Sequence, residues 1–210
     1  MIATLTGLGL SSAAGLNAYI PLLMIGLLAR YTDLVDLGSA WAWLEHPATL
    51  VVVGLLLVLE LVADKVPAVD SINDVVQTVV RPTAGGITFG AGADSVDLAD
   101  IVPAEAVAAS GGGVDWGAVI AGVVVALVFH VIKAGARPVI NTATVGTGGP
   151  VVSVAEDVAS ALTSFLAIVL PLLIVVVFPL MLVSGVWAVR RGRRRRAERR
   201  TRIGNGADAP

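Results

Sequence analysis

The sequence predicts an all-α integral membrane protein, and two observations lead to this prediction. Of its 210 residues, 56% are hydrophobic and only 14% are charged, and the mean hydropathy of +0.88 lies far outside the range of soluble globular domains. The apolar residues also occur in runs that are long enough to cross a bilayer at about 1.5 Å of helix per residue. We expect about four transmembrane helices, packed through small residues because only 5% of the residues are aromatic.

Charge divides the chain into two parts. Residues 1–189 hold the apolar runs and are expected to form a single transmembrane domain, whereas residues 190–210 are expected to form a basic, disordered cytoplasmic tail. Attraction to anionic lipid follows from such a tail. Because it lacks interleaved aromatic residues, we expect no nucleic-acid binding. Its arginines are Arg190, Arg191, Arg193, Arg194, Arg195, Arg196, Arg199, Arg200 and Arg202.

The first expected span covers residues 5–30, which carry no charge before Arg30. No Lys or Arg precedes the apolar run, so we do not expect a cleavable signal peptide. Pro21 should kink this helix and leave a carbonyl free near its middle, where protein or a cavity must satisfy it. Asn17 is expected either to line that gap or to bond to a neighbouring helix.

The second expected span covers residues 48–63, after a surface connection at 31–47 in which Trp41 and Trp43 form an interfacial anchor and His46 is solvated. This span ends in Glu60 and Asp64, which are four residues apart and so share a helix face. Two alternatives remain. Lys65 neutralises one carboxylate at the membrane boundary, or the pair belongs to a proton or cation site.

A short helix over residues 72–80, carrying Asp74 and Gln77, is too short to span and too apolar for open solvent. We expect it to be half of a re-entrant element, in which the Gly-rich strip of residues 81–92 turns back. Irregular backbone at membrane depth persists only where protein buries it or where it lines water.

A second strip, residues 137–148, repeats the first: both fit Arg-Pro, five residues, Thr-x-Gly-x-Gly. The two strips could expose backbone carbonyls and Thr hydroxyls as ligands, or their small residues could simply allow close helix contact. Arg81 and Arg137 could attract an anion or pair with nearby acids. The matched positions are Arg81, Pro82, Thr88, Gly90 and Gly92 with Arg137, Pro138, Thr144, Gly146 and Gly148, and His130 and Lys133 precede the second strip as Asp74 and Gln77 precede the first.

The remaining segments complete the expected bundle. Residues 93–115 form an acidic loop, 116–133 a third span, and 158–189 a long last helix that Pro171 and Pro179 bend or tilt. Ser153, Glu156 and Asp157 are expected to open that last helix, because its N-terminal dipole favours acids there.

The basic tail sets the expected topology in the cell inner (plasma) membrane. With residues after 190 in the cytoplasm, four spans place both termini inside, residues 31–47 and 134–157 outside, and 64–115 inside. The two Gly-rich strips then enter from opposite faces, which predicts an inverted repeat in which they meet near the midplane.

Residues 11–92 resemble a known family. The run GLNAYIPLLMIGLLAR and the later run LELVADKVPAVDSINDVVQTVVRPTAGGI are similar to the small bacterial and plant membrane proteins grouped as domain of unknown function 4126. The resemblance implies a polytopic membrane protein and no particular substrate. The positions that carry it are Pro21, Glu60, Asp64, Lys65, Pro67, Asp74, Gln77, Arg81, Pro82 and Gly85.

These features predict a small transporter or channel for an ion or small polar solute, with the lipid bilayer and a second copy of the chain as partners. The alternative is a non-transporting membrane scaffold or partner subunit. We expect no enzyme, metal or cofactor, because the chain has two histidines, no cysteine and no nucleophile or HExxH motif. The expected pathway residues are Asn17, Glu60, Asp64, Asp74, Gln77, Arg81, Thr88, Gly90, Gly92, His130, Lys133, Arg137, Asn141, Thr144, Gly146, Gly148, Glu156 and Asp157.

Overall fold

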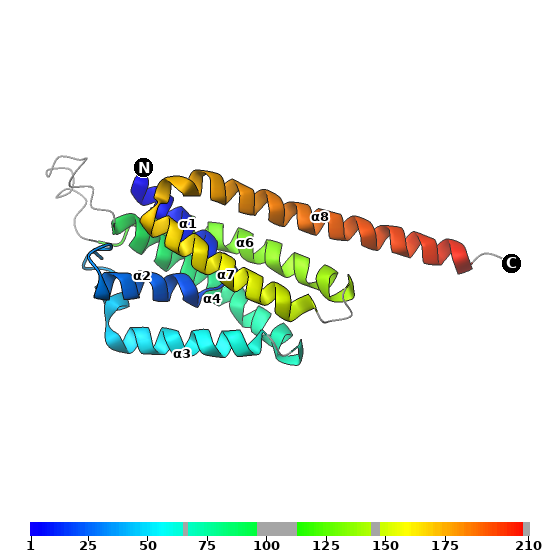
Figure 1. The fold of residues 1–210 in the computed structure, drawn as a ribbon, viewed down its shortest axis with the longest axis horizontal. Helices are drawn as coiled ribbons and strands as arrows, with labels where there is room; N and C mark the ends of the chain where they lie inside the picture. The colour runs from blue at the N-terminus through cyan, green and yellow to red at the C-terminus, as the bar shows by residue number, and fades with distance from the viewer. Residues whose placement is uncertain (65–66, 96–112, 144–147, 208–210) are drawn as a thin grey trace.

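A computed structural model describes residues 1–64, 67–95, 113–143 and 148–207, and all regular structure within these ranges is helical (Figure 1). This confirms the all-α class. Three segments are long and apolar enough to cross a membrane: Trp116–Ala136, Gly149–Val169 and Pro171–Gly192. The helices are α1 (Ile2–Leu16), α2 (Tyr19–Tyr31), η1 (Ala42–Glu45), α3 (Pro47–Ala63), α4 (Pro67–Asp94), α6 (Trp116–Ala143), α7 (Gly148–Val169), η3 (Pro171–Leu173) and α8 (Ile174–Ala207).

Helices α1 and α2 form a hairpin that turns back inside the bundle, where a single span over residues 5–30 was expected (Figure 1). Asn17 is extended, with φ −141° and ψ 122°. Its Oδ1 accepts hydrogen bonds from the amides of Tyr19, at 3.0 Å, and Ile20, at 3.2 Å, which caps α2. The expected kink at Pro21 is therefore wrong. The chain breaks at Asn17, and Pro21 lies in the first turn of α2, where its missing N–H costs little.

Close contacts confirm that both arms of the hairpin lie in the same half of the bundle. A Cβ on Gly9 of α1 would meet Ile174, at 2.8 Å, at the start of α8. A Cβ on Gly26 of α2 would meet Leu50, at 2.9 Å, at the start of α3. The hairpin therefore starts and ends at one end of the bundle, and its tip at Asn17 lies in the interior.

Helix α1 is the enclosed helix of the fold. Its partners are α4, α6 and α7, which surround it. Small residues make the approach possible, because a Cβ on Gly15 would lie 2.7 Å from the carbonyl oxygen of Ala126. Its buried residues are Ala3, Thr6, Gly7, Gly9, Leu10, Ser11, Ser12, Ala13, Ala14 and Gly15.

The first Gly-rich strip is not re-entrant. Residues 81–92 continue the helix that begins at Pro67, and Pro82 lies inside it. The physical reason is packing against α6: a Cβ on Gly85 would lie 2.8 Å from the carbonyl oxygen of Gly122, and one on Gly86 would lie 3.0 Å from that of Val119. Close helix contact outweighs the low helix propensity of glycine. The small-residue alternative is the correct one for this strip.

The second strip is also largely helical. Helix α6 continues through Ala143, past the expected end of the third span at 133, and α7 begins at Gly148. The expected outer connection at 134–157 and the expected helix start near 158 are therefore wrong. The two helices include residues 134–143 and 148–157, because apolar side chains such as Val151 continue the helical pattern there.

The expected long last helix is two helices. Leu170, with φ −136° and ψ 62°, interrupts it before Pro171, as expected of a residue that precedes proline. Pro179 lies inside α8. Helix α8 continues to Ala207, so residues 190–207 are helical where a disordered tail was expected.

The N-terminus and the C-terminal end of α8 lie at opposite ends of the bundle (Figure 1), whereas the expected topology placed both termini on one face of the membrane. The hairpin returns to the end of the bundle at which it starts, and α4 carries the chain from one end to the other. Helix α4 therefore begins and ends at opposite ends of the bundle, whereas residues 64–115 were expected on one face.

The outer surface of the bundle is apolar. On α3, α6, α7 and α8 large hydrophobic side chains are exposed at many positions, as lipid-facing helices require. Examples are Val51, Leu55, Val58, Leu59, Ile120, Val124, Val131, Val151, Leu162, Val176, Leu180 and Val183.

Candidate functional site

Buried polar and ionisable side chains from four helices and the hairpin tip meet inside the bundle. We call this set the charge cluster. Residues other than Glu156 and Asp157 are at most 5% exposed, and the Glu156 side chain is 15% exposed. The members are Asn17 at the hairpin tip, Glu60 and Asp64 of α3, Gln77 and Arg81 of α4, His130 and Lys133 of α6, and Ser153, Glu156 and Asp157 of α7.

Glu60 and Arg81 form a buried ion pair at the centre of the cluster. Arg81 Nη2 donates to Glu60 Oε1 at 2.9 Å, and the side chains are 0% and 1% exposed. Arg81 Nη1 lies 3.5 Å from His130 Nδ1, and Thr78 Oγ1 lies 3.1 Å from His130 Nε2. Because the two ring nitrogens contact different groups, the His130 imidazole is held in one orientation. The expectation that Arg81 pairs with an acid is met in this geometry.

The ammonium group of Lys133 lies against the end of α1. Its Nζ donates to the carbonyl oxygen of Leu16 at 2.8 Å and lies 2.9 Å from Glu156 Oε2 and 3.9 Å from Asp64 Oδ2. The Leu16 carbonyl is one of the last in α1, which no amide of α1 can reach, and it belongs to the negative end of the helix dipole. Backbone and carboxylate oxygens thus surround one buried cation.

Hydrogen bonds fasten the other acids of the cluster to different helices. Asp64 accepts from Asn73 Nδ2 at 2.8 Å and from Ser153 Oγ at 3.1 Å. The Asn17 side chain donates to Asp157 Oδ1 at 2.9 Å. These bonds tie α3 and α4 to α7, and α7 to the hairpin tip.

Besides Glu156 Oε2, which is ion-paired with Lys133 Nζ at 2.9 Å, three buried polar atoms in the cluster have no hydrogen-bond partner among the described residues: Glu60 Oε2, Gln77 Oε1 and Arg81 Nε. Gln77 and Arg81 are one helical turn apart on α4, and the Tyr19 hydroxyl has Glu60, Gln77 and Arg81 as electrostatic neighbours. Buried polar atoms in folded proteins are nearly always paired, with protein, water or a ligand. Two acceptors and one donor are therefore available here to a small polar species.

The charge balance of the cluster is negative. Its ionisable members other than His130 are four carboxylates and two cations, Arg81 and Lys133. Burial makes every unpaired charge costly. A cation that entered the cluster would reduce this imbalance, whereas an anion would increase it.

Several expected pathway residues lie elsewhere on α4. Thr88 donates within its own helix, to the carbonyl oxygen of Gly85 at 3.3 Å. Gly90 packs against Trp41, and a Cβ on Gly92 would meet Leu10 at 2.7 Å. These three residues form helix contacts outside the charge cluster, and their assignment to the pathway stays a prediction.

Other expected residues are not tested. Asp74, Arg137 and Asn141 belong to α4 and α6, but the structure does not describe their side chains. Thr144 and Gly146 lie outside the described residues, and Gly148 begins α7.

One part of the site has a signal in the sequence beyond its ionisable residues. Polar residues recur on α7 at Ser153, Asp157, Ser160 and Ser164 within an apolar helix, a spacing that places them on one face. Ser160 Oγ donates to the carbonyl oxygen of Ala13 at 3.0 Å, so this face holds α1. The role of the Leu16 carbonyl has no such signal in the sequence, because every residue carries a backbone carbonyl group.

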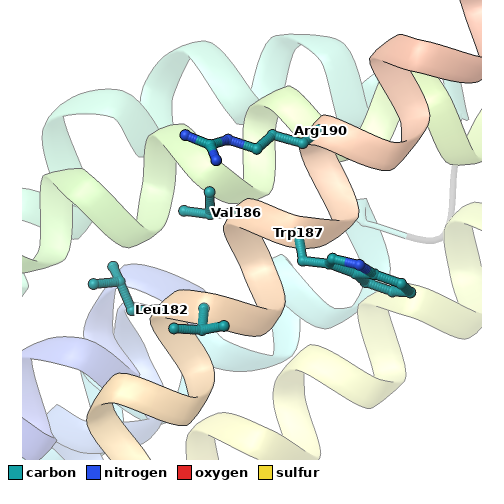
Figure 2. Close-up of a pocket in the computed structure, with 5 residues that line it drawn as sticks. Leu182, Val186, Trp187 and Arg190 are labelled. Atoms are coloured by element: carbon teal, nitrogen blue, oxygen red, sulfur yellow. The ribbon is translucent and has the colours of Figure 1, made fainter.

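A groove lies on α8, and none of its lining residues belongs to the charge cluster (Figure 2). It is lined by Leu182, Val183, Val186, Trp187 and Arg190. The guanidinium of the next residue, Arg191, lies 4.8 Å from the centre of the Trp187 ring. An aromatic ring beside arginines at the end of an apolar helix is typical of a membrane boundary, so we assign the groove to anchoring.

Comparison with known proteins gives a family. No match to the chain was found among the curated proteins or the solved structures. The family model described as domain of unknown function (DUF4126) matches residues 4–191. The match runs from α1 to the end of the apolar part of α8 and includes every member of the charge cluster. The chain therefore belongs to the DUF4126 family.

Proposed function

We propose that this protein is a small transporter or channel that moves an ion or small polar solute across the membrane, with the charge cluster as its binding site. The observation that carries the proposal is the hairpin of α1 and α2, whose tip stops inside the bundle against buried charges. Broken helices that present bare backbone groups near the midplane are how many transporters bind their substrates. No catalytic activity is part of the proposal.

The proposal places five helices across the membrane. In this proposal the chain crosses in α3, α4, α6, α7 and α8, of which the last three contain the long apolar segments, and the hairpin enters from one face only. The C-terminal part of α8, which carries Arg190, Arg191 and Arg194, lies at one end of the bundle, and the end of α2 and the start of α6, next to Asp33 and Asp115, lie at the other (Figure 1). The positive-inside rule then puts the arginine end in the cytoplasm and the N-terminus outside. We place the protein in the inner (plasma) membrane.

The unpaired atoms favour a binding site over an ion pair that only stabilises the fold. Ionisable groups at membrane depth are costly and mark ion pathways. The ion pair between Glu60 and Arg81 alone would be consistent with a purely structural role, but Glu60 Oε2 and Gln77 Oε1 have no hydrogen-bond partner among the described residues. Because buried polar atoms are nearly always paired, these two oxygens support binding of a ligand or of water at this position.

A second candidate is a scaffold or partner subunit that transports nothing. The observation in its favour is the apolar outer surface of α3 and α8, on which Leu59 and Val183 are 63% and 65% exposed. Such a face can pack against another chain, including a second copy in a homodimer. Purification with a stoichiometric partner chain, together with no flux, would favour this candidate.

Flux in proteoliposomes tests transport. Vesicles containing the purified protein and fluorescent indicators for Na⁺, K⁺ and pH, the last for NH₄⁺, are exposed to gradients of these three ions at fixed membrane potential. We expect flux above that of protein-free vesicles for at least one of these ions, and at least a tenfold loss in Glu60→Gln. Glu45→Gln, in the connection between α2 and α3, is the matched control and should keep full flux. Full flux in Glu60→Gln would overturn the charge cluster as the binding site, and no flux of these ions or of any other small polar solute would overturn transport.

A further inference from the structure

We infer that the oxygen cage around Lys133 Nζ is a binding site for a small monovalent cation, ammonium or an alkali metal ion, which binds in exchange with the lysine ammonium. The inference deepens the proposed function and rests on it for its physiological role. The binding itself is a separate property and has its own test.

The cage has the composition of a cation site. Its oxygens are the Leu16 carbonyl, 2.8 Å from Nζ, Glu156 Oε2, at 2.9 Å, and Asp64 Oδ2, at 3.9 Å. Carbonyl and carboxylate oxygens are the ligands that hard cations prefer, and a ring of them can replace a hydration shell. The lysine ammonium is itself a small cation with three donors, so it occupies the place that a free cation would take.

A second observation points to a ligand beyond Lys133. Glu60 precedes Asp64 by one turn of α3 and interacts electrostatically with both Asp64 and Lys133. The residue is 2% exposed, and its Oε2 has no hydrogen-bond partner among the described residues. A buried carboxyl oxygen one helical turn from Asp64 is thus available to a second cation.

The charge and geometry favour a monovalent ion. The C-terminal end of α1 adds its partial negative charge to that of the carboxylates. In the part of the chain that the structure describes, no three His, Cys, Asp or Glu side chains lie close enough together to hold a metal ion. Multidentate carboxylate ligation, which divalent ions prefer, is therefore not offered by this cage.

Lysine is suited to the exchange. Its ammonium stands on a flexible four-carbon stem, so it can leave the cage without movement of α6. While Lys133 occupies the cage, its ammonium partly neutralises the two carboxylates and holds the hairpin tip at Leu16. When a cation takes its place, the same oxygens keep one positive charge among them, but the tether between α6 and the hairpin is released.

The test removes the lysine and supplies cations in solution. In detergent, Lys133→Met leaves Asp64 and Glu156 without this ammonium, and we expect its melting temperature in choline chloride to fall well below that of the wild type. Replacing choline by NH₄⁺, K⁺ or Na⁺ at equal ionic strength should raise it by roughly 5–10 °C once the ion reaches about a hundred times its dissociation constant. The ammonium arm and the alkali arms identify which ion the cage prefers.

Two further variants sharpen the result. Lys133→Met with Glu156→Gln lowers the negative charge of the cage, so its cation-specific shift should disappear. Arg194→Met, on an exposed part of α8, should show no difference between choline and the small cations. The inference is overturned if Lys133→Met responds equally to choline and to the small cations, or if it remains unfolded in all of them.

The outcomes separate this inference from the proposed function. Cation-specific rescue of Lys133→Met without flux by the wild type would establish the site and overturn transport. Flux by the wild type without rescue would leave transport standing and overturn the site.

Discussion

Asn17 joins two parts of the fold that are far apart in sequence: its side-chain nitrogen donates to Asp157 Oδ1 at 2.9 Å, across 140 residues. The oxygen of the same amide caps α2 through the amides of Tyr19 and Ile20. One side chain therefore both caps the start of α2, the second arm of the hairpin, and ties the tip of the hairpin to the charge cluster.

Asn17→Ala is expected to destabilise the protein by about 1–2 kcal/mol through loss of the cap, and by more if the Asp157 oxygen stays unpaired. Asn17→Asp keeps the capping acceptor but places a carboxylate beside Asp157, so its defect should shrink as the pH is lowered and either acid is protonated. Denaturant titration in detergent measures both effects. Ser184→Ala, which removes an exposed bond within one helix, is the control. An Asn17→Ala variant as stable as this control would contradict the assigned cap.

Arg81→Met should cost about 3–5 kcal/mol, because it leaves the buried Glu60 carboxylate without its partner. Adding Glu60→Gln to it should restore part of that loss. A double-mutant cycle of unfolding free energies measures the coupling. Strict additivity of the two single changes would show that the 2.9 Å pair contributes no interaction energy.

Gly122→Ala should destabilise the bundle by about 1–3 kcal/mol, because its new methyl group would meet the Gly85 carbonyl group of α4. Gly54→Ala is the matched control, since nothing lies within 4 Å of a Cβ at that position on α3. That change should be neutral or slightly stabilising through helix propensity. The melting temperatures of both variants in the same detergent measure this difference. Equal effects at the two glycines would argue against close packing of α4 on α6.

Single cysteines test the placement of the two ends, because the chain has no cysteine of its own. In intact cells, a maleimide that cannot cross the membrane should label Ile2→Cys, Asp33→Cys and Asp115→Cys. Arg194→Cys should react only after the membrane is permeabilised. Labelling of Ile2→Cys and Arg194→Cys from the same face would exclude the arrangement in which the N-terminus lies outside.

Apolar runs predicted the plain helices well. The span expected at 48–63 is α3, at Pro47–Ala63, because nothing within it competes with a helix. The break in the first span was assigned to Pro21 and occurs at Asn17. Proline near a helix start costs little, whereas an asparagine that caps the following turn is a positive signal for a new helix.

The prediction that the first Gly-rich strip is re-entrant was wrong for a different reason. The low helix propensity of Gly85 and Gly86 is visible locally, but the contact with Gly122 that overrides it comes from a helix formed much later in the chain. The same limit applies to the site. Ionisable residues within apolar runs identified Glu60 and Lys133 as members, but which groups meet depends on how the helices pack.

The hairpin tip has a consequence for biogenesis. The partners of Leu16 and Asn17, namely Lys133 and Asp157, lie 117 and 140 residues further along the chain. Until the ribosome has made them, the unpaired carbonyl and amide groups at the tip would be costly to bury in lipid. The hairpin is translated before its partners, so it must stay in a polar environment until α6 and α7 are present and can pack around it.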